Sequence, residues 1–367
     1  MHLTHPAGRP ARRGPGPNRS GPWAWLRTCA AALAVLAGLV LPAVSSSPAW
    51  ARPSPDAYVT NAGTNDVSVI DTTTNTVIAT VPVGGDPEGV ASTPNGRRVY
   101  VTNRASNTVS VIDTRTNTDV ATIPVGNMPI GIAITPNSLR AYVANAGSDD
   151  VSVIDTTTNT VIATIPVSTS PNLVAITPDG LHAYVTNFGS GNVSVIDTTT
   201  NTVVDTIPVG TGPIGIASTP NGRRAYATNF ASNDVSVIDT TTNTVIATIP
   251  VGTHPHDVAI TPNGRRAYVV ANNGTNDVSV IDTTTNTVVD TIPVGGITGG
   301  VAITPNGRRA YIVTVSSNDV QVIDTTTNTV VATVPVGAFP GRVAITPGNG
   351  KHHKPHKPEK PKKPCHH

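Results

Sequence analysis

Four side chains could act on a substrate or hold an anion: Glu88, His256, Asp257 and Arg342. A carboxylate or an imidazole can serve as a general base, and a guanidinium binds carboxylates and phosphates. Glu88 is the one glutamate between residues 52 and 350. We predict a small polar site in which His256 or Glu88 is the base and Arg342 holds an anion. The alternative is solvated loops without chemistry, in which Arg342 simply pairs with Glu88.

A metal or a cofactor has weaker support in the sequence. His254 and His256 are two residues apart and could share a metal ion, but two histidines make an incomplete zinc site. The chain has no Cys-x-x-Cys-His motif for covalent haem and no Gly-x-Ser-x-Gly nucleophile motif. We therefore predict no cofactor.

A repeat of about 42 residues must position these side chains. Each repeat has four short runs rich in β-branched residues, separated by Gly, Asn, Asp and Pro, as in strands joined by tight turns. Four strands at this period are typical of a propeller blade. The sequence predicts an all-β fold, a seven-bladed β-propeller with four-stranded antiparallel blades. Each repeat is marked by one tyrosine: Tyr58, Tyr100, Tyr142, Tyr184, Tyr226, Tyr268 and Tyr311.

Proline predicts the orientation of each blade. One proline lies inside the third run of every repeat, as at Pro82 and Pro124. Because proline has no N–H to donate to a ladder, it is confined to the edges of sheets. The third run is therefore predicted to be the outermost strand. The run that contains Val-Ala is small and uncharged, as expected of an innermost strand near the axis.

The two ends of the repeat region predict how the ring closes. No Val-Ala-Ile-Thr-Pro segment precedes Tyr58, but one follows the last repeat at Val343–Pro347. Seven innermost strands match seven tyrosine strands only if this C-terminal strand joins the N-terminal blade. Such closure removes open sheet edges. We predict a propeller over residues 57–348.

Comparison of the seven repeats distinguishes positions that are the same in every blade, which we assign to the scaffold, from positions that vary between blades. Asp71 and its counterparts open Asp-Thr-x-Thr-Asn-Thr turns, so their carboxylates are predicted to accept backbone N–H bonds. Calcium binding is an alternative, but the spacing matches no known calcium loop. Variation clusters in the loops before the inner strand and after the tyrosine strand, which we expect to open on one face, the loop face. Its predicted binding residues are Asp86, Glu88, Arg104, Met128, Phe188, Phe230, His254, His256, Phe339 and Arg342.

Three repeats begin with Tyr58-Val-Thr-Asn61, Tyr100-Val-Thr-Asn103 and Tyr184-Val-Thr-Asn187. These segments resemble the signature of the YVTN-family β-propeller repeats, which belong with WD40-like repeats in architecture. Ala144 and Ala227 depart from the literal motif. The resemblance implies an exported microbial propeller of the surface-layer or lactonase-like kind. It does not decide between them, because one fold hosts many functions.

The two ends differ in composition from the repeat region. Residues 1–51 contain five arginines, an apolar run from Cys29 to Val44 and an Ala-x-Ala site at Ala49, which predict a cleaved signal peptide. Residues 52–56 are a predicted linker, and the Lys/His/Pro-rich residues 349–367 a predicted disordered tail. No transmembrane anchor is expected after cleavage. Residues 52–350 carry a net charge of −8, a poor footprint for nucleic acid.

These observations predict a secreted, monomeric and non-enzymatic binding or adhesion scaffold, associated with the cell surface or envelope. Its partner would be a protein or an envelope polymer. The alternative is a lactonase-like hydrolase with a polar site at the channel mouth, where His256, Asp257, Glu88 and Arg342 are the candidate residues.

Overall fold

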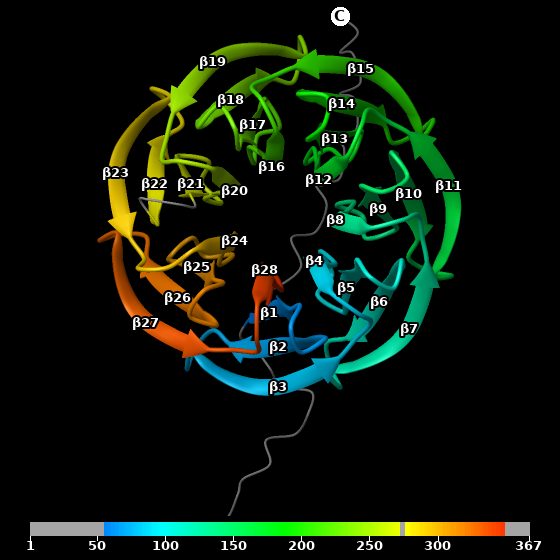
Figure 1. Cartoon of the computed structure of the whole chain (residues 1–367), viewed down its shortest axis with the longest axis vertical. Helices are drawn as coiled ribbons and strands as arrows, with labels where there is room; N and C mark the ends of the chain where they lie inside the picture. Colours follow the sequence, from blue (N-terminus) through cyan, green and yellow to red (C-terminus); the bar gives the residue numbers. More distant parts are fainter. Residues whose placement is uncertain (1–54, 272–275, 349–367) are drawn as a thin grey trace, which may run out of the picture. The chain divides into compact units, whose positions relative to one another are not determined.

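The computed structural model describes residues 55–271 and 276–348, which form seven four-stranded antiparallel sheets around a central axis (Figure 1). This confirms the predicted seven-bladed propeller. The described residues contain no helix, and hence none that is long and apolar enough to span a membrane. The predicted signal peptide, most of the linker and the predicted tail lie outside the described residues.

Each blade has an inner strand, a tyrosine strand, a third strand and an outer strand, in order from the axis outward (Figure 1). The inner strands of blades 1 to 7 are β28 (Pro340–Ile345), β4 (Pro87–Ser92), β8 (Pro129–Ile134), β12 (Pro171–Ile176), β16 (Pro213–Ser218), β20 (Pro255–Ile260) and β24 (Thr298–Ile303). The tyrosine strands are β1 (Asp56–Asn61), β5 (Arg98–Asn103), β9 (Arg140–Asn145), β13 (His182–Asn187), β17 (Arg224–Asn229), β21 (Arg266–Ala271) and β25 (Arg309–Thr314).

The third and outer strands complete the blades. The third strands are β2 (Asp66–Asp71), β6 (Thr108–Asp113), β10 (Asp150–Asp155), β14 (Asn192–Asp197), β18 (Asp234–Asp239), β22 (Asp277–Asp282) and β26 (Asp319–Asp324). The outer strands are β3 (Thr76–Pro82), β7 (Thr118–Pro124), β11 (Thr160–Pro166), β15 (Thr202–Pro208), β19 (Thr244–Pro250), β23 (Thr287–Pro293) and β27 (Thr329–Pro335). Each outer strand ends on its exposed proline, which confirms the predicted orientation.

Ring closure follows the prediction from the two ends. The C-terminal strand β28 pairs antiparallel with β1, with Ala57 opposite Ile345 and Val59 opposite Val343. The Asp56 N–H donates to Thr346 Oγ1 at 2.9 Å, and the Thr346 N–H donates to the Asp56 carbonyl at 2.9 Å. The first blade is therefore built from both ends of the repeat region.

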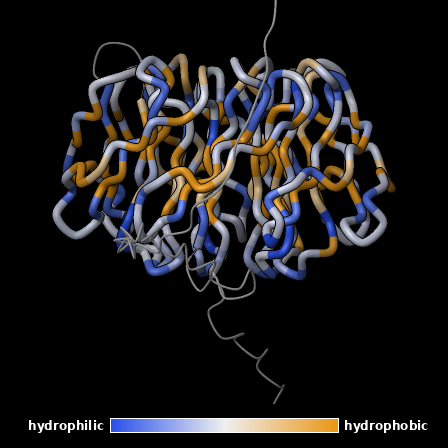
Figure 2. Tube along the Cα trace, turned by 90° about the horizontal axis from the view of Figure 1, so that it is seen from below, coloured by the Kyte–Doolittle hydropathy of each residue, from blue (hydrophilic) through white to orange (hydrophobic). Residues whose placement is uncertain are grey.

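The hydrophobic core lies between neighbouring blades. In one cluster, Val67 and Val69 of blade 1 pack with Val101 and Ile112 of blade 2, and all four are fully buried. Burying each such side chain contributes ~1.5–3 kcal/mol. Figure 2 shows the apolar positions in the middle of the blades and hydrophilic ones toward both edges of the ring.

A tyrosine–asparagine hydrogen bond joins each blade to the next. The Tyr58 hydroxyl of blade 1 donates to Asn117 Oδ1 of blade 2 at 2.7 Å, and Tyr311 of blade 7 donates to Asn75 Oδ1 of blade 1 at 2.6 Å. The other five tyrosines make the same bond. Burial raises the pKa of Tyr311 to about 12, so its hydroxyl remains a donor at neutral pH. These bonds form a closed belt around the ring.

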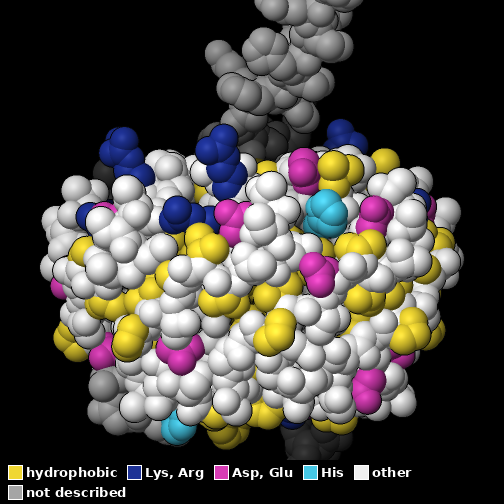
Figure 3. Space-filling model, turned by 90° about the horizontal axis from the view of Figure 1, so that it is seen from above, with side chains coloured by type: hydrophobic (Ala, Val, Ile, Leu, Met, Phe, Trp, Pro, Cys, Tyr) yellow, Lys and Arg dark blue, Asp and Glu magenta, His cyan; other side chains and the backbone are white. Residues whose placement is uncertain are grey.

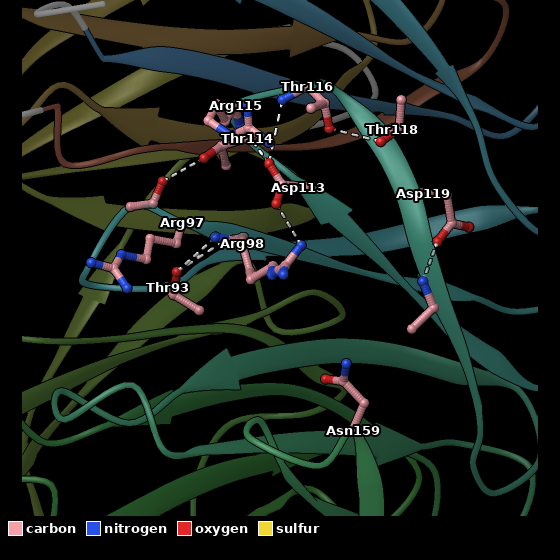
Figure 4. Close-up of polar contacts among 12 residues, drawn as sticks. Thr93, Arg97, Arg98, Asp113, Thr114, Arg115, Thr116, Thr118, Asp119 and Asn159 are labelled. Atoms are coloured by element: carbon pink, nitrogen blue, oxygen red, sulfur yellow. Dashed lines mark hydrogen bonds and ion pairs between the residues drawn. The ribbon is translucent and has the colours of Figure 1, made fainter. Parts of the chain in front are cut away.

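The aspartate turns are structural, as predicted. Asp113 Oδ1 accepts the N–H groups of Arg115 and Thr116 at 2.9 and 3.3 Å, and Asp113 Oδ2 accepts a bond from Arg98 (Figure 4). The six counterparts accept the same two backbone bonds. Bonds from the turn lower the pKa of Asp155, which keeps the carboxylate ionised.

Candidate functional site

Glu88, His256, Asp257 and Arg342, the candidate residues of the predicted polar site, lie at the starts of inner strands. Glu88 is in β4 of blade 2, His256 and Asp257 are in β20 of blade 6, and Arg342 is in β28 of blade 1. The inner strands β20, β24, β28 and β4 are successive neighbours around the axis (Figure 1). The four residues thus lie along one side of the inner ring, which we call the polar arc.

A buried ion pair is the main feature of the polar arc. Arg342 Nη1 lies 3.1 Å from Asp257 Oδ2, and the two side chains are 7% and 13% exposed. Asp257 Oδ1 also accepts the Val258 N–H at 2.9 Å, and Oδ2 accepts the Val301 N–H at 3.2 Å. Burial raises the pKa of Asp257, whereas Arg342 and the two backbone donors act to lower it. One carboxylate therefore ties together blades 6, 7 and 1.

Glycine in the intervening strand makes this bridge possible. Asp257 and Arg342 are separated by β24 of blade 7, which begins Thr298-Gly-Gly. A Cβ on Gly300 would lie 2.9 Å from Arg342 Cα and 3.2 Å from Arg342 Cβ. A side chain at position 300 would therefore collide with β28 and occupy the space through which Arg342 reaches Asp257.

Glu88 approaches Arg342 from the other side but is not its ion-pair partner. Thr60 Oγ1 donates to the Glu88 carbonyl at 2.9 Å and accepts the Arg342 N–H at 3.0 Å. The Glu88 carboxylate lies near Gly341, whose ideal Cβ position is 3.8 Å from Glu88 Oε2. The alternative in which Arg342 pairs with Glu88 is therefore wrong. Arg342 pairs with Asp257 instead, across Gly299 and Gly300 of β24.

His256 is a neutral imidazole in this setting. Burial lowers its pKa to about 3, the positive charge of Arg342 acts in the same direction, and a hydrogen bond with the Gly299 backbone opposes it. Its Nδ1 atom is enclosed and has no hydrogen-bond partner. A base with so low a pKa accepts a proton poorly at neutral pH, so the surroundings disfavour His256 as a general base.

The opposite side of the inner ring is apolar. The strand starts of blades 3 to 5 carry Ile130, Leu173 and Ile214, and Leu173 and Ile214 are 9% and 6% exposed. We call these three residues the apolar arc. Asn172 lies among them, and its Oδ1 is buried without a hydrogen-bond partner. The inner ring is therefore divided into a charged side and a hydrophobic side.

Both variable loop types open on the same face, as predicted. The loop after each tyrosine strand bonds to the crossover before the inner strand, as when the Arg104 N–H donates to the Asp86 carbonyl at 2.9 Å. Arg104 Nε also lies 2.7 Å from Asp86 Oδ2 in an exposed ion pair. Met128 and Phe339 are 46% and 65% exposed on this loop face.

An aromatic row occupies part of the loop face. Phe188 and Phe230 lie with ring centroids 6.4 Å apart, and Phe230 stacks on His254 at 4.4 Å with an interplanar angle of 15°. These residues come from the post-tyrosine loops of blades 4 and 5 and from the crossover into blade 6. His254 thus packs against Phe230, whereas His256 lies beside Arg342. A metal ion shared by the two histidines stays a prediction, and the described residues contain no grouping of three or more His, Cys, Asp or Glu that could hold a metal.

Large side chains stand at strained positions of the crossovers. Met128, His254 and Phe339 have φ angles of 52°, 53° and 51°. The equivalent residue in another crossover is Gly212, at φ 64°. A non-glycine residue in this left-handed region costs ~1–2 kcal/mol. These three blades therefore carry large side chains where glycine fits without strain, exposed at Met128 and Phe339 and half-buried at His254.

Sequence reasoning missed the Asp257–Arg342 bridge and the tyrosine–asparagine belt. The loss of the usual proline at Thr298, followed by two glycines, was the available signal for the bridge. The signal for the belt was a tyrosine–asparagine separation of 59 residues in four repeats and 60 in two others.

The chain is thus a closed seven-bladed propeller whose inner ring has a polar arc and an apolar arc, and whose loop face carries aromatic and other large side chains. Residues 137–340, more than half of the chain, match the profile of the cytochrome D1 heme domain family. The chain therefore belongs to this family. No curated protein matches it at a significant level.

Solved structures share the architecture. Hydrazine synthase of Kuenenia stuttgartiensis matches with 25% identity and a TM-score of 0.65, over 75% of this chain and 96% of that one. The dihydro-heme d1 dehydrogenase NirN in complex with DHE matches with 16% identity and a TM-score of 0.63, over 80% and 76%. A proposed 6-phosphogluconolactonase from Bacteroides uniformis matches with 18% identity and a TM-score of 0.70, over 80% and 100%. The last two likenesses concern the fold alone.

The family name implies a haem, but His256 of the polar arc does not fit as its ligand. A haem iron needs an open imidazole or similar ligand, yet Nδ1 of His256 is enclosed. The burial and the Arg342 charge that lower the proton affinity of His256 also oppose a metal cation at the same ring. Arg342 is paired with Asp257, although its Nε has no hydrogen-bond partner. The chain therefore matches its family in fold, and His256 does not fit as an iron ligand.

Proposed function

We propose that the chain is an exported, non-enzymatic propeller that binds a protein or polymer of the cell envelope through its loop face. Export rests on the basic and apolar order of residues 1–51, and the narrower kinship with YVTN repeat propellers on the Tyr-Val-Thr-Asn segments. A monomer is expected, since closure pairs β28 with β1 and each exposed outer strand ends on a proline, which disfavours pairing with another chain.

One observation carries the proposal. Met128, His254 and Phe339 hold large side chains at left-handed φ angles on the loop face. Strain of this kind persists where the surroundings enforce it, and it concentrates at sites that bind. Folding alone would favour glycine at these positions, as at Gly212. The aromatic row of Phe188, Phe230 and His254 adds flat apolar surface to the same face, as binding surfaces often do.

The polar arc supports a structural role over a catalytic one. The Asp257 carboxylate accepts the Val258 and Val301 N–H groups and is paired with Arg342. His256 is a poor base because its pKa is about 3. A carboxylate that already has three protein partners is poorly available to act on a substrate.

The test is retention of the purified protein, without residues 1–51, on washed envelope material. The Met128→Gly, His254→Gly and Phe339→Gly triple variant should lose most retention while keeping its fold, because glycine suits all three backbones. A matched control is the Leu139→Ser and Leu181→Ser variant, which removes two apolar side chains, 53% and 51% exposed, from the opposite face. Equal retention of the triple variant and the wild type would overturn the proposal.

The second candidate is a lactonase-like hydrolase. It is favoured by one observation: the Arg342 Nε atom has no hydrogen-bond partner and lies on the strand next to Glu88. If this candidate is right, Glu88→Gln and His256→Ala should each abolish hydrolysis of a lactone by the protein. An unchanged rate in both variants would remove it.

A further inference from the structure

The face opposite the loop face carries a cavity that no part of the proposed function uses. It lies between blades 5 and 6, has a volume of about 340 Å³, and is lined by Thr219, Asn221, Arg223, Arg224, Asn263, Gly264, Arg265, Thr283 and Thr284. Three of these nine residues are arginines and none is acidic. Every lysine of the chain lies at or beyond Lys351, so the Lys and Arg side chains that gather along the upper edge of the ring in Figure 3 are arginines.

Arg224 departs from the pattern of its repeat. In blades 2, 6 and 7 the equivalent arginines pair with the turn aspartate of their own blade, as Arg98 does with Asp113 at 2.8 Å (Figure 4). Arg224 instead donates from Nη1 to the Thr283 carbonyl of blade 6 at 2.7 Å. This bond holds the guanidinium in the wall of the cavity.

The acceptors around the cavity are already occupied. Asn221 Oδ1 accepts from the Thr219 hydroxyl and the Arg223 N–H, and Asn263 Oδ1 accepts from the Arg265 N–H. The Gly264 carbonyl accepts the Thr283 hydroxyl, and the Thr283 carbonyl accepts from Arg224. The lining offers a ligand the guanidinium groups of its three arginines and the amide N–H groups of Asn221 and Asn263.

The carboxylate next in sequence to the lining residues Thr283 and Thr284 is bound by other groups. Asp282 precedes the lining residues Thr283 and Thr284, but its Oδ2 is bound by Arg266 Nη1 at 2.8 Å. Its Oδ1 accepts the Thr284 and Thr285 N–H groups at 2.8 and 3.3 Å. The charges of Arg223 and Arg265, which are exposed, are therefore not balanced by a carboxylate in the cavity wall.

We propose that this cavity binds a tetrahedral dianion, as in a small phosphate ester. Guanidinium groups suit such ligands because their planar N–H forks match oxyanion geometry. A dianion has several acceptor oxygens and can therefore bind arginines from both turns, whereas a single carboxylate has only two oxygens. The cavity volume allows a small organic group beside the phosphate.

The test is isothermal titration of the propeller with inorganic phosphate, and with acetate for comparison. Phosphate should bind with saturation, and the Arg223→Ala and Arg265→Ala double variant should bind at least about tenfold more weakly. The matched control is the Arg97→Ala and Arg115→Ala double variant, which removes the same charge from exposed positions of blade 2. In the next blade Leu139 stands at the position equivalent to Arg97, so this turn does not add a second arginine. The phosphate affinity of this control variant should stay within about twofold of the wild type.

Arg224→Lys sharpens the test without a change in net charge. A guanidinium can bind the Thr283 carbonyl through one nitrogen and the ligand through another, whereas the compact ammonium of lysine cannot do both. The phosphate affinity of Arg224→Lys should therefore be lower than that of the wild type. Equal weakening in the two double variants would show a general charge effect and overturn the proposal. Absence of saturable phosphate binding, or acetate binding as tight as phosphate, would also overturn it.

Discussion

The polar arc and the apolar arc occupy equivalent positions of one ring and are held together differently. In blades 3 to 5 the strand starts bury Leu173 and Ile214 and half-bury Ile130. On the other side, Asp257 and Arg342 form a buried ion pair across β24, which carries Gly299 and Gly300 near its start. The charged side includes β28, the strand that closes the ring. The comparison indicates that this fold adds a directional, polar link where its two ends must meet, and uses apolar packing elsewhere.

The largest effect is expected when the buried pair loses its cation. Arg342→Met leaves the Asp257 carboxylate buried without its partner and should destabilise the protein by about 3–5 kcal/mol at neutral pH, measured by denaturant unfolding. Arg104→Met, which breaks the exposed pair with Asp86, should cost no more than about 1 kcal/mol. Similar losses in the two variants would mean that burial does not distinguish the pairs.

The same variant should have a characteristic pH dependence. Without Arg342, the pKa of Asp257 rises further above its ordinary value, because burial already raises it. A carboxyl whose pKa is higher in the folded state binds protons more tightly when folded, so stability falls as pH rises through that range. The deficit of Arg342→Met should therefore be smallest below about pH 4 and grow toward neutrality. Leu173→Ala in the apolar arc should show a deficit that does not change with pH.

A smaller loss is expected from the strand between the charged partners. Gly300→Ala places a Cβ within 2.9 Å of Arg342 Cα, so β28 must shift, and stability should fall by about 1–3 kcal/mol in thermal unfolding. In the Arg342→Met background the same change should cost less, since the ion pair is already lost. An unchanged cost there would mean that Gly300 serves only the backbone contact.

The smallest predicted effect concerns the tyrosine–asparagine belt. Tyr311→Phe removes the bond to Asn75 that links blade 7 to blade 1 and should cost about 1 kcal/mol in denaturant unfolding. Tyr142→Phe, which breaks the same bond between blades 3 and 4, should cost the same amount. If Tyr311→Phe lost much more unfolding free energy than Tyr142→Phe, the tyrosine–asparagine belt rather than the polar arc would be the main link that closes the ring.

The sequence predicted the blades because every local signal repeats seven times. Prolines such as Pro82 mark the outer strands, and Val343–Pro347 supplies the missing inner strand, so pattern alone determines topology. The candidate site was predicted less completely. Glu88, His256, Asp257 and Arg342 were grouped into one polar site, but the partner of Arg342 was not predicted. A side chain that crosses a neighbouring strand depends on the packing of three blades. The cavity beside Arg224 was also missed, because Arg224 and Arg266 stand in the same sequence context and differ in side-chain direction.

The central claim is that Asp257 and Arg342 act as one unit in joining blades 6, 7 and 1, and a double-mutant cycle tests it most directly. Denaturant unfolding of the wild type, Asp257→Asn, Arg342→Met and the double variant gives the coupling free energy between the two side chains. We predict a coupling of at least about 2 kcal/mol, with the double variant more stable than Arg342→Met alone. Additive losses, with a coupling near zero, would contradict the account.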